Sequence, residues 1–110
     1  MIERELIGVM NNTKWDELRG SMYALGKLSP QFRIKDRDRD EPFPWDGEWF
    51  YHFRGEGYEY IEWVELRTPR LEQREAVRKC LREIHLPGEE TDQGFRVVGW
   101  MHPGDVVGYI

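Results

Sequence analysis

Nine of the chain's fifteen aromatic residues lie between residues 43 and 63, and this clustering limits how the chain can fold. Aromatic side chains bury large areas, so some of these nine must belong to the core. Nine is more than one face of a small sheet needs, and the remainder are expected at the surface. The nine residues are Phe43, Trp45, Trp49, Phe50, Tyr51, Phe53, Tyr58, Tyr60 and Trp63.

The same part of the chain is strongly acidic. From Asp36 to Leu66 there are ten Asp or Glu residues against three Arg, a local charge of −7 in a chain whose total is −5. Carboxylates interleaved with aromatic rings predict a surface that binds something basic. The sequence pI of about 5.2 argues against nucleic acid as the main partner, because phosphate binding needs a basic face.

Length and composition predict one globular domain over residues 1–110. The single cysteine, Cys80, excludes an internal disulfide and a multi-cysteine metal site, which fits a reducing cytoplasm. The N-terminus lacks the basic start of a signal peptide, and no apolar run approaches the roughly 20 residues that span a bilayer. The sequence therefore predicts a cytoplasmic protein that does not bind membranes.

Apolar residues at helical spacing predict a helix over residues 13–25 and another over residues 70–85. Thr13 and Asp16 fit a capping box at the start of the first helix. Cys80 lies on the apolar stripe of the second helix. Free cysteine in such a stripe is usually a small buried hydrophobe, so we expect that role and not a nucleophile.

Alternating apolar and polar residues predict a strand over residues 32–35 and a hairpin made of residues 48–53 and 58–66. Two later segments, residues 95–101 and 106–110, have the pattern of short strands. This order of elements predicts a small α+β domain. Its mostly antiparallel sheet would contain the central hairpin, and both helices would pack on one face.

The polar residues show no pattern that indicates catalysis. Asp36, Asp38 and Asp40 have the alternate spacing that opens a calcium loop, but the Gly and Glu that an EF-hand needs later in the loop are missing. His52 lies near carboxylates and could act as a general base, but a partly buried strand residue is the simpler interpretation. The sequence predicts no catalytic residue, no metal site and no cofactor.

Two segments, Asn11–Trp15 (NNTKW) and Trp45–Phe53 (WDGEWFYHF), resemble a family of small uncharacterised bacterial proteins. Further matches at residues 60–65, 84–89 and 94–97 spread the resemblance over nearly the whole chain. The family is similar in size and character to immunity proteins of bacterial toxin systems. The resemblance implies a binding protein and carries no catalytic residue onto this chain.

The leading hypothesis is a cytoplasmic protein-binding module that acts as an immunity protein and neutralises a basic toxin. Carboxylates would pair with Lys or Arg of the toxin, and Trp45 would fill a pocket on it. The residues predicted to bind the partner are Asp38, Asp40, Glu41, Trp45, Asp46 and Glu48.

Two alternatives use other residues. A small enzyme or ligand-binding domain would have an aromatic-lined pocket formed by Trp49, Tyr51, His52 and Tyr58. A self-associating regulatory domain would form a homodimer instead. Residues 67–85 carry six basic residues against three acidic ones, and they would meet the acidic hairpin of a second copy.

Overall fold

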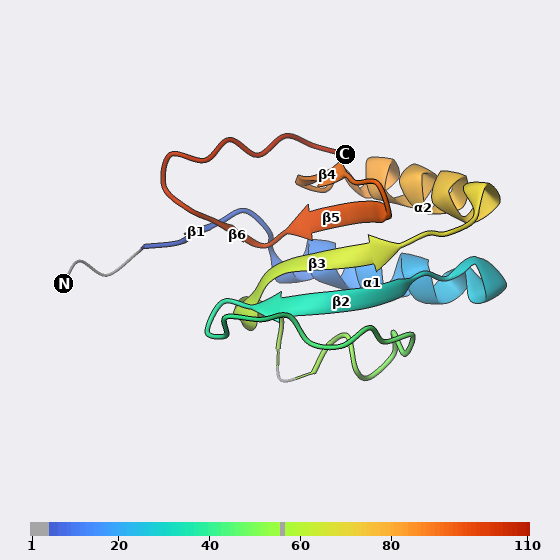
Figure 1. The fold of residues 1–110 in the computed structure, drawn as a ribbon, viewed down its shortest axis with the longest axis horizontal. Helices are drawn as coiled ribbons and strands as arrows, with labels where there is room; N and C mark the ends of the chain where they lie inside the picture. Colours follow the sequence, from blue (N-terminus) through green and yellow to red (C-terminus); the bar gives the residue numbers. More distant parts are fainter. Residues whose placement is uncertain (1–4, 56) are drawn as a thin grey trace.

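In the computed structural model, which describes residues 5–55 and 57–110, four antiparallel strands form the main sheet (Figure 1). Their order across the sheet is β2-β3-β5-β4. A separate antiparallel pair joins β1 to β6. The strands are β1 (Ile7–Gly8), β2 (Gln31–Asp36), β3 (Ile61–Arg67), β4 (Gly88–Glu90), β5 (Gly94–Val98) and β6 (Trp100–Met101).

Two α-helices, α1 (Asn12–Ala24) and α2 (Leu71–Ile84), pack on one face of the main sheet (Figure 1). The predicted α+β class is therefore confirmed. The predicted capping box is wrong, because Asn11 caps α1 and its Oδ1 accepts a 2.8 Å hydrogen bond from the Lys14 backbone N–H. Short 3₁₀ helices follow at η1 (Gly26–Leu28) and η2 (Tyr58–Tyr60).

The core lies between the helices and the inner face of the sheet. Cys80 is partly buried and packs against the edge of this core, and burial raises the pKa of its thiol. This agrees with the predicted role of Cys80 as a small hydrophobe. The buried residues come from both helices, from three strands and from the segments between them. They are Trp15, Leu18, Met22, Phe32, Trp49, Phe53, Tyr58, Ile61, Val64, Leu66, Val77, Leu81, Leu86, Phe95 and Val97.

The outer face of the sheet carries a layer of charged and aromatic side chains. Glu65 on β3 accepts hydrogen bonds from Arg33 on β2, at 2.5 Å, and from Arg96 on β5, at 2.9 Å. The three residues are cross-strand neighbours in the sheet register. The Trp45 ring lies within 4.7 Å of the Arg33 guanidinium and 4.4 Å of the Arg67 guanidinium. These contacts hold the outer side chains in place by charge and by cation–π attraction.

The predicted hairpin is wrong in its first strand. Residues 49–55 form consecutive turns, and residues 58–60 form η2. β3 begins at Ile61 and pairs with β2 and β5 instead. Residues 106–110 also form no strand, apart from one bridge between Tyr109 and Pro87.

Irregular segments cover both edges of the main sheet. At the β2 edge, the Phe43 N–H donates to the Ile34 carbonyl, and Phe32 and Asp46 exchange two backbone hydrogen bonds, all at 2.8 Å. At the β4 edge, the Gly88 N–H donates to the Gly108 carbonyl at 2.9 Å. Neither edge strand therefore presents a full row of unpaired backbone groups.

Candidate functional site

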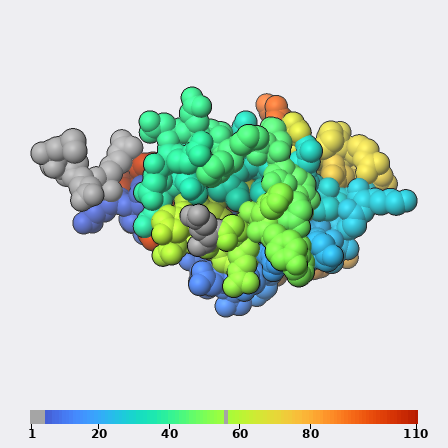
Figure 2. Space-filling view, turned by 90° about the horizontal axis from the view of Figure 1, so that it is seen from below, coloured from blue at the N-terminus to red at the C-terminus, as the bar shows by residue number. Residues whose placement is uncertain are grey.

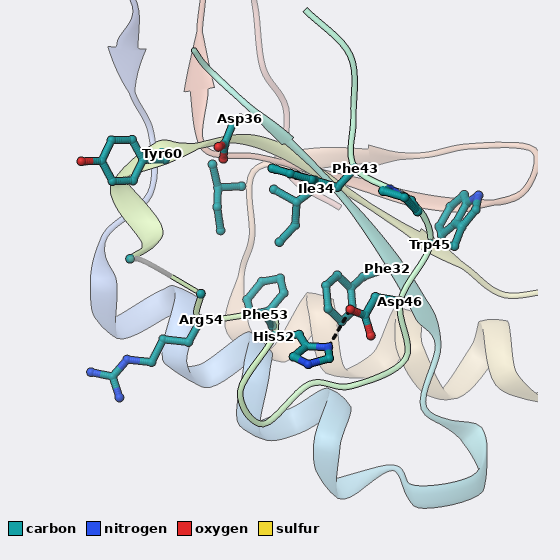
Figure 3. Close-up of a pocket in the computed structure, with 14 residues that line it drawn as sticks. Phe32, Ile34, Asp36, Phe43, Trp45, Asp46, His52, Phe53, Arg54 and Tyr60 are labelled. Atoms are coloured by element: carbon teal, nitrogen blue, oxygen red, sulfur yellow. Dashed lines mark hydrogen bonds and ion pairs between the residues drawn. The ribbon is translucent and has the colours of Figure 1, made fainter. Parts of the chain in front are cut away.

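A cavity of about 490 Å³ lies between β2 and the segment that follows it in the chain (Figure 3). This volume is in the range of small-ligand pockets. The walls are mostly apolar, and a few charged or polar side chains reach them. The lining residues are Phe32, Ile34, Asp36, Phe43, Pro44, Trp45, Asp46, His52, Phe53, Arg54, Gly55, Gly57, Tyr60 and Ile61.

One side of the cavity is built by the turns of residues 49–55, and Glu48 organises their beginning. Its carboxylate accepts backbone hydrogen bonds from Phe50 at 3.2 Å, Tyr51 at 2.8 Å and His52 at 2.7 Å. These N–H groups lower the pKa of Glu48, so the carboxylate is ionised at neutral pH. A carboxylate that satisfies three successive N–H groups favours a helix-like turn over the predicted strand.

Two aromatic side chains anchor these turns in the core. Trp49 and Phe53 are four residues apart, point to the same side and are only 2% and 1% exposed. The Trp49 indole N–H donates to the Pro30 carbonyl at 2.8 Å. From α1, the Arg19 Nε donates to the carbonyl of Phe50 at 2.8 Å. The turns are therefore tied to the helix layer at several points, and the cavity wall is preformed.

Asp46 and His52 form a polar pair at the cavity. The Asp46 Oδ2 and the His52 Nδ1 are 2.8 Å apart, and Asp46 Oδ1 accepts the Glu48 backbone N–H at 2.8 Å. Partial burial of Asp46 opposes its ionisation, but the hydrogen bonds from Glu48 and His52 outweigh this and lower its pKa. Asp46 is therefore a carboxylate at neutral pH and gives this side of the cavity a negative charge.

Exposed aromatic side chains surround the cavity and the turns. Phe43 and Tyr60 line the cavity and are each 37% exposed. Phe50 is 43% exposed and Tyr51 is 73% exposed, and neither lines it. Figure 2 shows that the segment between β2 and β3 makes up much of this face of the molecule.

The same segment carries exposed carboxylates. Asp38, Asp40 and Glu41 are all exposed, and no ion pair joins them to another residue in the described ranges. In the sequence, residues 37–60 contain seven acidic residues against three arginines, a formal charge of −4. The segment between β2 and β3 thus combines negative charge with exposed rings.

Comparison with known protein families assigns the chain to one of them. A family model described as a family of unknown function, DUF6678, matches residues 1–104. The chain belongs to DUF6678. No curated protein and no solved structure matches this DUF6678 chain. The family assigns no activity, so the site of this DUF6678 protein has to be interpreted from its geometry.

The predicted partner-binding residues fall into three groups. Asp38, Asp40 and Glu41 are exposed, as described above. Asp46 and Glu48 instead hold the turns together, through their own hydrogen bonds. Trp45 is half-buried, contacts the guanidinium groups of Arg33 and Arg67 and borders the cavity.

The four residues predicted to line a pocket do not line one cavity together. His52 alone among them borders the 490 Å³ cavity. Trp49 and Tyr58 are core residues, and Tyr51 points to solvent. The Tyr58 hydroxyl donates to Asp16 Oδ1 at 2.6 Å, and burial together with this carboxylate raises the pKa of Tyr58 to about 12.

Sequence reasoning missed Ile34 and Tyr60 as cavity residues. Ile34 matched the pattern of a core strand, and Tyr60 was assigned to a strand that in the structure begins one residue later, at Ile61. The clustering of aromatic residues was the one available signal for Phe43 and Tyr60. Nothing local in the sequence shows that Ile34 lies opposite His52 and Phe53, which Figure 3 makes plain.

Across residues 5–55 and 57–110, no three His, Cys, Asp or Glu side chains gather in a way that could hold a metal ion. Within the same ranges, neither helix has the length and apolar character required to cross a membrane. The cavity and the acidic, aromatic face around it are the candidate site.

Proposed function

We propose that this DUF6678 protein is a binding module for a basic protein partner, and that it acts as an immunity protein that neutralises a bacterial toxin. The observation that carries the proposal is the segment between β2 and β3, which presents exposed carboxylates at Asp38, Asp40 and Glu41 and exposed aromatic rings on the preformed turns of residues 49–55. Negative charge on such a face steers a basic partner and raises its association rate.

The turns are suited to rigid binding. Glu48, Arg19 and the buried Trp49 fix the backbone before any partner arrives, so little conformational entropy is lost on binding. Tyr51 and Phe50 present large apolar areas from this fixed backbone. Aromatic anchors of this kind dominate the binding energy of many interfaces.

Co-purification from native cells tests the proposal directly. The tagged protein should recover a basic protein in a stoichiometric amount. Expression of that protein alone should be toxic, and co-expression of this chain should remove the toxicity. Recovery of the chain alone, with no stoichiometric protein, contradicts the proposed function.

A matched pair of variants tests the face. Combined Asp38→Asn, Asp40→Asn and Glu41→Gln substitutions should lower the association rate about tenfold at low salt, with the difference fading at roughly 1 M salt. The control removes three charges elsewhere, at Glu17→Gln, Glu75→Gln and Glu83→Gln. The three control carboxylates have no ion pair among the described residues. Equal effects of the two triple variants would assign the steering to net charge and not to this face.

The cavity favours a second candidate function, a small-ligand-binding domain or a small enzyme. Neutral His52 can donate its Nδ1–H to Asp46, which leaves Nε2 able to accept a proton or a hydrogen bond. A soaked ligand seated against this pair would support that function. The homodimer alternative has less support, because the hairpin it requires does not form and Arg74 and Arg78 both pair with Glu90.

A further inference from the structure

We infer that the 490 Å³ cavity receives one long cationic side chain, an arginine or a lysine, of the basic protein partner. This inference rests on the proposed function and names what the partner inserts. It is carried by the composition of the cavity walls and by the position of a charged group among them.

The walls match an aliphatic stem. Ile34 projects from β2 towards the turns, and Phe53 and His52 lie opposite it (Figure 3). Phe43 and Tyr60 complete the apolar lining and are partly exposed, so the cavity can be entered from solvent. Arginine and lysine pack their methylene groups on such surfaces and place the charge at the end. The ring faces also attract a cation at close range.

The charges select a cation over an anion or a neutral group. The Asp46 carboxylate lies at the wall of the cavity, whereas the Arg54 guanidinium points away from it (Figure 3). Filling the cavity with an apolar group would remove water from the Asp46 carboxylate without replacing its hydrogen bonds, which is costly. A guanidinium or ammonium group can donate to this carboxylate in place of water and supplies the opposite charge. A cation–π contact of this kind already exists within the chain, because the Arg39 guanidinium lies 4.0 Å from the Phe43 ring centroid.

Three exposed carboxylates outside the cavity fit this picture. Asp38, Asp40 and Glu41 precede Phe43 in the chain and are exposed. They would attract the partner over a distance of roughly the Debye length, about 8–10 Å at physiological salt. The cavity would then hold one side chain by contact. The exposed carboxylates would thus attract the partner, and the cavity residues would hold its side chain.

Titration of the full chain with butylguanidinium, followed by amide and side-chain NMR shifts, tests the anchor without the partner. Shifts should concentrate on Ile34, Phe43, His52 and Phe53. Binding should be at least about tenfold tighter than for guanidinium, which lacks the stem, and for butanol, which lacks the charge. Binding no tighter than either control, or shifts elsewhere on the molecule, would overturn the inference and leave the proposed function standing.

Two substitutions test whether butylguanidinium binds in the cavity. Asp46→Asn should weaken butylguanidinium binding about tenfold, and Asp92→Asn, which removes the same charge at an exposed turn far along the chain, should change it less than about twofold. Equal weakening by both would show that general electrostatics and not the cavity binds the cation. If Asp46→Asn does not fold, Ile34→Phe serves instead, because the larger ring fills the cavity and should abolish binding.

Competition with the partner closes the test. Once a partner is isolated, saturating butylguanidinium should weaken its complex at least about fivefold, and butanol should not. A probe that binds the cavity but leaves the complex unchanged would refute the assignment of the cavity to a partner side chain. Failure to isolate any partner would count against the proposed function alone, since the NMR titration stands without it.

Discussion

Replacing Trp49 with alanine is expected to lower the free energy of unfolding by about 4 kcal/mol. Truncation of a buried tryptophan typically costs about 3–5 kcal/mol. Trp49 is 2% exposed and packs with ring centroids 4.6 Å from both Phe32 and Phe53. The lost indole hydrogen bond leaves the Pro30 carbonyl without its donor, which adds about 1 kcal/mol. Partial collapse of the turns recovers some of this loss.

The expected loss is large for a chain of this size, whose total stability should be about 5–15 kcal/mol. With an m-value of about 2 kcal/mol/M, the urea midpoint should fall by about 2 M. Unfolding is best followed by far-UV circular dichroism, because the substitution removes one of the five tryptophans that report by fluorescence.

Tyr51→Ala is the matched control for this measurement. In the hairpin that the sequence predicts, Trp49 and Tyr51 share one face and should matter about equally. In the structure Tyr51 is 73% exposed, and its truncation should cost less than about 0.5 kcal/mol. Similar losses for the two variants would refute the turn geometry and with it the cavity wall.

Three further predictions concern the rest of the molecule. Gly20→Ala should raise the free energy of unfolding by about 0.5–1 kcal/mol in urea titrations, because an added Cβ in the helix meets no atom within 4 Å; a destabilised variant would contradict this. Burial raises the pKa of Glu65, but hydrogen bonds from Arg33 and Arg96 outweigh it and lower the pKa below 4.5. The Glu65 contribution to stability is therefore complete above pH 4.5 and is lost as the pH falls through the lowered pKa, so Glu65→Gln should flatten the acid limb of a stability–pH curve. Cys80 should react with a thiol reagent at pH 8 far more slowly in the folded chain than in denaturant, because burial raises its pKa; equal rates would show that the thiol is accessible.

Helix α1 and strand β2 could be predicted because the apolar residues in each follow a single period. Trp15, Leu18 and Met22 repeat at helical spacing, and all three are buried in α1. Phe32 and Ile34 alternate with charged residues, and β2 forms there. In both segments the local preference and the tertiary packing agree, which is the condition under which such patterns succeed.

The segment from Trp49 to Phe53 satisfied two periods at once. Trp49, Tyr51 and Phe53 alternate as in a strand, but Trp49 and Phe53 are also four residues apart, as on one side of a helical turn. The Glu48 carboxylate decides between these possibilities through its three backbone hydrogen bonds. A glutamate before an aromatic run is too common to signal such a cap from the sequence alone.

The cavity depends on contacts between distant parts of the chain, and this is why its residues were only partly predicted. Asp46 and His52 were both named, but for different sites, because the hydrogen bond between them requires the turn to form. Ile34 reaches the same cavity from another element. Residue type indicates which side chains favour a binding face, whereas their convergence follows from the fold.

The segment from Phe43 to Asp46 borders the cavity and also occupies the open edge of β2. A partner that pulled this segment away would uncover a strand able to pair with the same strand of another molecule, the first step towards domain swapping or fibrillar aggregation. Under the proposed function, binding of the partner is therefore expected to leave this segment in place. Substitutions that loosen residues 43–46 should then appear first as lost solubility, before any change in affinity is measurable.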